Sequence, residues 1–158
     1  MRSPLKVLTT ILAGLALATP ALADDIGTSK KIGVGVGGGT LSSGLSGKMY
    51  LKEDFAVQAT VGAGWGTAIG VDVVKEFPIN EYAPGRLFWG AGAGAGTWLV
   101  SGYGGSIFAV SGIVQLGWHF KDMPLELTTD IRPTFFTGDY LYSGLYLGGG
   151  GGAVRYYF

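Results

Sequence analysis

The sequence contains no cysteine and only one histidine, His119, among its 158 residues. The absence of cysteine excludes disulfides and thiolate-ligated metals, and a single histidine gives little basis for a transition-metal centre. Proline is scarce as well, with six residues, whereas aromatic and β-branched residues are abundant, which is typical of a folded chain rather than a disordered one. We therefore expect an ordered protein that holds neither a metal nor a cofactor.

The sequence also lacks an excess of basic residues and, beyond its N-terminus, any long apolar run. Lysine and arginine number 11 and so do aspartate and glutamate, so nucleic acid is not an expected partner. Beyond residue 23 no run of about 18 apolar residues occurs, which excludes a membrane-spanning helix there. The apolar segment 7–17 follows Arg2 and Lys6 and precedes Ala21 and Ala23, which is the pattern of a cleaved secretory signal peptide. We expect a signal peptide at 1–23 and a mature domain at 24–158, whose net charge is −2 because Arg2 and Lys6 are removed.

Glycine is unusually frequent, with 30 residues. It recurs in segments where apolar residues alternate with glycine or polar residues. In the segment 107–120 the even positions are apolar and mostly bulky. In the segment 125–136 the odd positions are mainly apolar, while Glu126, Asp130 and Arg132 occupy even positions. Period-two alternation predicts β-strands. The turn at 121–124 joins the two segments into a hairpin with one dry face and one polar face.

The same alternation recurs along the whole mature chain. It predicts eight strands, which begin at 32–36 and continue at 45–51, 55–65, 68–77, 86–99, 107–120, 125–136 and 144–158. Short turns at 52–54 and 66–67 and polar loops at 78–85, 100–106 and 137–143 connect them. The glycine run 148–152 breaks the alternation of the last strand, which predicts a bulge or bend. An even number of strands with short consecutive connections predicts an all-β, eight-stranded antiparallel up-and-down barrel.

Two kinds of eight-stranded barrel fit this pattern, and they differ in which face points inward. A soluble lipocalin-like barrel has an apolar interior, whereas a transmembrane β-barrel turns its apolar face to lipid and its polar face to the lumen. The interior of eight strands is narrow. Bulky residues such as Trp89 and Trp118 would crowd it, while the glycines of the opposite face make room for long polar side chains. We therefore predict the transmembrane form.

The distribution of aromatic residues agrees with that form. If both termini are periplasmic, one group lies on the apolar face near the periplasmic strand ends: Phe55, Phe77, Trp89, Trp118, Phe120, Tyr156 and Phe158. Such a group is typical of the aromatic girdle at a lipid interface. Trp65, Phe108 and Phe135 are candidates for the outer girdle.

The chain ends in alternating aromatics, with Phe158 as its last residue. In this ending and in its strand pattern, the mature chain resembles the small eight-stranded outer-membrane proteins of the OmpA/OmpX-type barrel superfamily. The resemblance implies a location in the outer membrane of a Gram-negative bacterium. It also implies contact with outer-membrane lipid and recognition of Phe158 by the barrel-assembly machinery. We expect the protein to be a monomer.

The polar face carries charged residues of both signs. An unpaired buried charge costs several kcal/mol, so we expect these side chains to pair with one another across the lumen. The predicted structural network consists of Lys48, Asp72, Glu126, Asp130, Arg132 and Arg155, with Glu76 on the same face. The closeness of Arg132 to Glu126 and Asp130 favours ion pairs over a catalytic pair of acids.

Three functions are compatible with these features. A barrel with a structural or general interaction role and no catalytic residues is favoured. The first alternative is an enzyme that modifies lipid A or phospholipid. Deacylases of this kind have a His-x-Ser-Asn arrangement. Here His119 is followed by Phe120 and Lys121, so the serine is missing. The second alternative is a narrow channel or a carrier of a small ligand.

Overall fold

The computed structural model describes residues 31–63, 66–82, 85–100, 105–139 and 141–158, so the predicted signal peptide and Trp65 lie outside the described residues. The described residues form ten antiparallel strands in a single sheet. These are β1 (Ile32–Gly39), β2 (Ser43–Lys52), β3 (Phe55–Ala63), β4 (Gly66–Tyr82), β5 (Gly85–Val100), β6 (Ser106–Phe120), β7 (Leu125–Ile131), β8 (Thr134–Gly138), β9 (Leu141–Tyr146) and β10 (Gly150–Tyr157). None of the described residues belongs to a helix with the length and apolar character needed to cross a bilayer.

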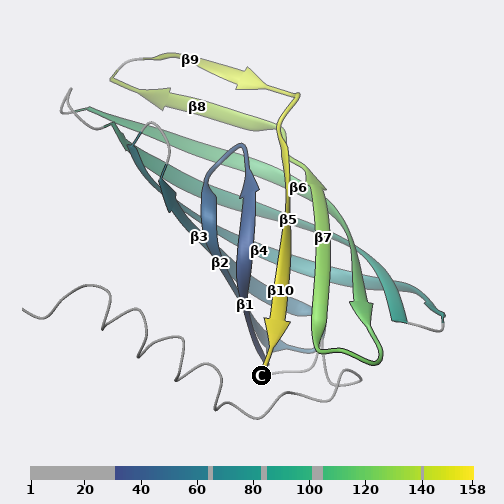
Figure 1. Cartoon of the computed structure of the whole chain (residues 1–158). Coiled ribbons are helices and arrows are strands. Elements are labelled where there is room, and N and C mark those ends of the chain that lie inside the picture. Colours follow the sequence, from purple (N-terminus) through teal and green to yellow (C-terminus); the bar gives the residue numbers. More distant parts are fainter. Residues whose placement is uncertain (1–30, 64–65, 83–84, 101–104, 140) are drawn as a thin grey trace, which may run out of the picture.

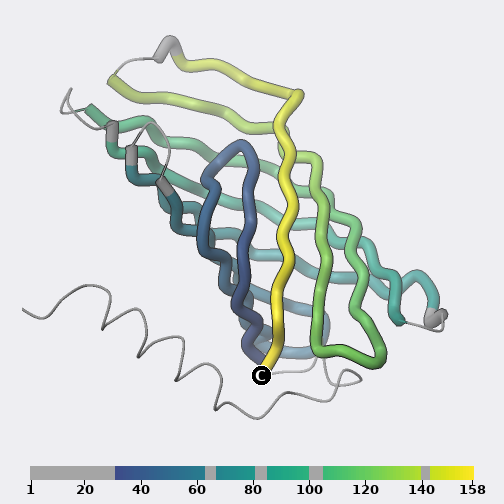
Figure 2. Tube along the Cα trace, viewed as in Figure 1, coloured from purple at the N-terminus to yellow at the C-terminus, as the bar shows by residue number. Residues whose placement is uncertain are grey.

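The sheet closes on itself because its first strand pairs with its last. In β1, Val36 is opposite Leu45 of β2 and also opposite Val154 of β10. Strands β1 to β6 pair in sequence, and both β7 and β8 pair with β6, while β10 pairs with β7 and β9 pairs with β8. Segments β7 and β8 thus form one interrupted strand, and β9 and β10 form another. The ten segments therefore make the predicted eight-stranded up-and-down barrel (Figure 1). Figure 2 shows β1 and β10, from opposite ends of the chain, side by side.

Both interruptions have a cause in the sequence. Pro133 follows β7 and has no backbone N–H to donate to a ladder, and the predicted strand 125–136 is therefore divided there. Residues 147–149 separate β9 from β10 at the start of the glycine run, which confirms the bend predicted in the last strand. Backbone bonds hold the two breaks together, since Arg132 N donates to Gly149 O at 2.8 Å.

Three predicted connections are wrong, and in each case a strand is longer than expected. Strand β4 continues through the predicted loop 78–85, because a register shift between Pro78 and Asn80 lets the ladder bypass the proline. Residues 66–67 belong to β4, and Gly66 is opposite Val100 of β5. The predicted loop 137–143 is mostly hairpin, with the hydroxyls of Thr137 and Ser143 3.1 Å apart across β8 and β9.

The two faces of the sheet differ as the alternation predicts. Large apolar side chains point outward and are solvent-exposed, for example Leu45 at 71% and Val110 at 62%. The buried side chains are mainly polar, charged or aromatic and fill the lumen. We call the end that carries the turns 53–54 and 121–124 and the C-terminus the turn end, and the end that carries residues 40–42 and 139 the loop end (Figure 1).

Candidate functional site

A group of buried polar and charged side chains lies in the lumen towards the turn end, centred on Glu126 of β7. Its Oε1 accepts a hydrogen bond from Arg155 Nη1 at 2.7 Å. Its Oε2 accepts one from Lys48 Nζ at 2.6 Å and one from Tyr157 OH at 3.0 Å, and it lies 2.9 Å from His119 Nε2. Glu126 therefore joins residues of β2, β6 and β10 to β7 and is fully buried.

Glu76 of β4 is the second carboxylate of this group. It forms an ion pair with Lys48, accepts a hydrogen bond from Tyr50 OH at 2.8 Å and accepts another from Gln115 Nε2 at 3.2 Å. The Lys48 ammonium thus lies between two carboxylates, and it also lies 5.3 Å from the centre of the Phe88 ring. We call Lys48, Tyr50, Glu76, His119, Glu126 and Tyr157 the turn-end cluster.

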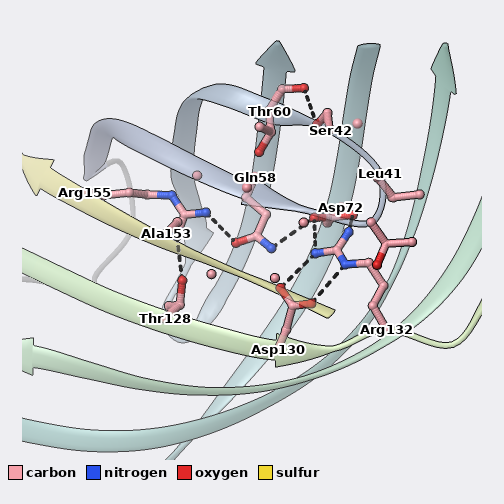
Figure 3. A pocket seen from close by; sticks show the side chains of 17 residues that line it. Leu41, Ser42, Gln58, Thr60, Asp72, Thr128, Asp130, Arg132, Ala153 and Arg155 are labelled. Carbon is pink, nitrogen blue, oxygen red and sulfur yellow. Dashed lines mark hydrogen bonds and ion pairs between the residues drawn. The ribbon is translucent and has the colours of Figure 1, made fainter. Parts of the chain in front are cut away.

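A second ion-pair group, the Arg132 triad, lies nearer the loop end. The Arg132 guanidinium donates to both carboxylate oxygens of Asp72, at 2.9 and 3.1 Å. It donates as well to both oxygens of Asp130, each at 3.1 Å (Figure 3). This bidentate geometry is the strong form of an arginine–carboxylate contact. It ties β4 to the β7–β8 break, where backbone pairing with β6 is interrupted.

Gln58 of β3 connects the two groups. Arg155 Nη2 donates to Gln58 Oε1 at 3.3 Å, and Gln58 Nε2 donates to Asp72 Oδ2 at 3.0 Å (Figure 3). Because Arg155 also bonds Glu126, a continuous chain of hydrogen bonds and ion pairs runs from the turn-end cluster to Asp130. The chain involves six of the eight strand positions, so it fixes the register of distant strands against one another.

The connection 40–42 closes the lumen at the loop end. Thr40 N donates to Gly150 O at 3.0 Å, and Ser42 Oγ donates to Thr60 O at 3.2 Å. Leu41, in the connection between β1 and β2, is only 3% exposed. Its side chain lies towards Gly70 of β4 and Gly96 of β5, across the loop end of the lumen. Between this cap and the Arg132 triad lies a cavity of about 30 Å³ (Figure 3), which has room for about two water molecules.

Inward glycines make the room that these side chains occupy. A Cβ at Gly33 would lie 2.7 Å from the Tyr157 ring. A Cβ at Gly94 would overlap Asp72, and one at Gly117 would overlap the Phe88 ring. The inward glycines thus make room for lumen side chains, as predicted, but the side chains nearest to these three glycines are Tyr157, Asp72 and Phe88 rather than the long polar residues for which the space was expected.

The Gly117 contact gives a first prediction. Replacing Gly117 by alanine should lower the free energy of unfolding by about 1–3 kcal/mol, because the new methyl group must displace the buried Phe88 ring. Gly47→Ala is the matched control, since its Cβ would meet no atom closer than Gly33 O at 3.9 Å. That variant should be neutral or slightly more stable. Urea unfolding of both variants in lipid vesicles tests the difference, and equal losses would contradict it.

The structure brings the six predicted network residues together in two groups rather than one. Lys48, Glu126 and Arg155 lie in or beside the turn-end cluster, whereas Asp72, Asp130 and Arg132 form the triad. The ion pair of Asp130 with Arg132 agrees with the prediction, but Glu126 pairs with Lys48 and Arg155 instead of Arg132. The network also contains Gln58, Gln115 and Tyr157, which the pattern of charged residues does not predict. The alternation of the strands places these three side chains on the inward face. Because they are uncharged, however, the sequence does not indicate that they pair with the charged residues.

The donor atoms of Glu76, His119 and Glu126 lie within 4.8 Å of one another, close enough for one metal ion. Lys48 Nζ already contacts both of these carboxylates. A metal ion would therefore have to displace a buried ammonium group, so the geometry favours an ion-pair cluster over a metal centre.

No family model matches the chain, and neither a curated protein nor a solved structure gives a match. The fold and the lumen contacts are therefore the basis for a functional proposal.

Proposed function

We propose that this chain is a small outer-membrane β-barrel protein of a Gram-negative bacterium, with a structural or general interaction role and no catalysis. The observation that supports this most is the inverted distribution of its side chains. Lys48, Glu126 and Arg155 are buried inside, while leucine, valine and isoleucine side chains are exposed outside. A protein surrounded by water has the opposite preference, whereas a barrel surrounded by acyl chains requires this arrangement.

The aromatic residues give independent support, because they gather at the turn end of the outer face. Three contacting pairs occur there: Phe77 with Trp89, Trp118 with Phe120, and Tyr156 with Phe158. Phe108 and Phe135 are exposed towards the loop end. Aromatic side chains at both edges of an apolar belt are typical of the two lipid interfaces. In the proposed orientation the turn end is periplasmic, and the terminal Phe158 is recognised by the barrel-assembly machinery.

The physical role follows from closure. The closed part of the sheet pairs its backbone groups with neighbouring strands, as lipid requires, and among the described strands only β9, towards the loop end, has a single partner strand. The hydrogen-bonded chain inside holds the strands in one register. We propose that the protein acts as a monomeric, rigid membrane module that presents its loop-end surface outward. The filled lumen gives no support to a wide pore, and His119, buried against Glu126, is not positioned to reach a lipid substrate.

Electrophoresis of the mature protein tests this proposal. The protein is extracted from membranes or refolded in detergent, and samples with and without boiling are compared on the same gel in sodium dodecyl sulfate. A closed barrel should keep its compact shape until it is boiled, so the two samples should migrate differently. The proposal fails if the purified protein stays dissolved as a monomer without detergent, because the exposed apolar belt would then be compatible with water.

A further inference from the structure

Two lysines lie on the outer face towards the turn end, beside the aromatic residue Phe55. Lys52 is the last residue of β2, and Lys75 points outward from β4 between the apolar residues Val73 and Phe77. Phe55 of β3 lies between the two lysines and is opposite both in register. We call Lys52, Phe55, Lys75, Phe77 and Trp89 the basic-aromatic patch.

Each lysine of this patch lies over an aromatic ring. Lys52 Nζ is 5.2 Å from the centre of the Phe55 ring, and Lys75 Nζ is 5.3 Å from that of Phe77. The Phe77 ring is stacked on Trp89 at 4.4 Å. Among the described residues, neither ammonium group forms an ion pair. Asp54, in the adjacent turn, is paired with Arg86 at 2.6 Å, which leaves Glu53 as the exposed acid next to Lys52.

We propose that the basic-aromatic patch binds the phosphate headgroup of an anionic phospholipid. The inference rests on the proposed function, since it presupposes a bilayer around the apolar belt. Two exposed ammonium groups then lie at headgroup depth, flanking Phe55, and their charge complements a lipid phosphate. The exposed Val73, next to Lys75 on the apolar side, provides the surface for the acyl chains of the same lipid. A protein partner is less suitable, because the patch is continuous with the belt that lipid covers.

The expected preference is substantial. Each lysine near an anionic membrane surface contributes about a fivefold increase in affinity, which corresponds to ~1 kcal/mol. The two together therefore predict up to about a twenty-fivefold preference for an anionic over a zwitterionic lipid at this position. Salt should weaken the preference, because both ammonium groups are exposed and the Debye length is only ~8 Å at physiological ionic strength.

Trp89 provides the probe, because it belongs to the patch and is 42% exposed. The mature protein with Trp65, Trp98 and Trp118 replaced by phenylalanine is reconstituted in vesicles of brominated phosphatidylcholine mixed with phosphatidylglycerol. Bromine quenches the fluorescence of Trp89. If phosphatidylglycerol is bound preferentially, it should displace the brominated lipid and restore the fluorescence more than random mixing predicts. The double variant K52Q/K75Q should return to random mixing, while K121Q, in the β6–β7 turn, should keep the preference.

The outcomes separate this inference from the proposed function. Quenching without any preference for phosphatidylglycerol, or a preference that survives K52Q/K75Q, would overturn the lipid site while leaving the membrane location intact. Absence of quenching in every vesicle would mean that the belt does not face lipid and would overturn both. If the single-tryptophan protein does not fold, the same comparison is made with all four tryptophans, where the double variant should still lower the preference relative to K121Q.

Discussion

Replacing Glu126 by alanine should lower the free energy of unfolding by about 3–5 kcal/mol, the usual cost of removing one partner from a buried ion pair. The substitution deprives Lys48, Arg155 and Tyr157 of the same acceptor, and all three remain in a lumen from which water is largely excluded. Urea unfolding of the protein in lipid vesicles, followed by tryptophan fluorescence, measures the loss. Glu53→Ala is the control, because Glu53 is an exposed carboxylate in the β2–β3 turn and its removal should change stability by less than about 0.5 kcal/mol.

A second substitution distinguishes lost charge pairing from a simple cavity. Adding Lys48→Met to Glu126→Ala removes the ammonium group that was left without this partner, so the double variant should lose less stability than the sum of the two single variants. Strict additivity would mean that the Lys48–Glu126 contact contributes little. A loss of less than about 1 kcal/mol in Glu126→Ala itself would mean that the turn-end cluster does not hold the barrel together.

Replacing Val114 by arginine should destabilise the protein in a bilayer by about 2–4 kcal/mol, the cost of a basic side chain on the lipid face near the midplane. Val114 points outward from the middle of β6 and is 55% exposed, so the longer side chain meets no steric obstacle. In water the same exposed substitution would be nearly neutral. The sign and size of the effect therefore report on the surrounding solvent rather than on packing.

Met123→Arg is the matched control for this test. Met123 is 46% exposed, similar to Val114, but it lies in the β6–β7 turn at the turn end. There an arginine should cost about 0–1 kcal/mol, because it can extend to water and headgroups. The unfolding free energies of the two variants in vesicles give the comparison. Equal and small effects would contradict the membrane assignment for the apolar belt.

Much of the fold could be predicted because a β-strand with two different faces has a sequence in which apolar and polar residues alternate. Alternation with period two fixed the face of each residue, as for Val110 outward and Glu126 inward, and the glycine run 148–152 marked the bend before β10. Connections were harder to predict. Pro78 predicts the end of a strand, but a bulge beside it lets β4 continue to Tyr82. No pattern within the chain indicates that the ladder with β5 extends so far.

The candidate site was predictable in composition but not in its pairings. Inward parity and charge identified Arg132 and Asp130, which are two residues apart on neighbouring inward positions. They did not identify Gln58 as the bridge between Arg155 and Asp72, nor Leu41 as the cap of the lumen. Both depend on how far a side chain extends across the barrel, and a linear pattern contains no information about that distance.

By itself, the sequence determined which side chains face inward and that the inward set is polar, because the direction of a side chain alternates residue by residue along any strand. The three-dimensional fold was needed to establish that Glu126 pairs with Lys48 and Arg155 while Arg132 pairs with Asp72 and Asp130. Partners across a lumen are set by the register of all eight strand positions together, and that register is fixed by backbone ladders between segments far apart in the chain.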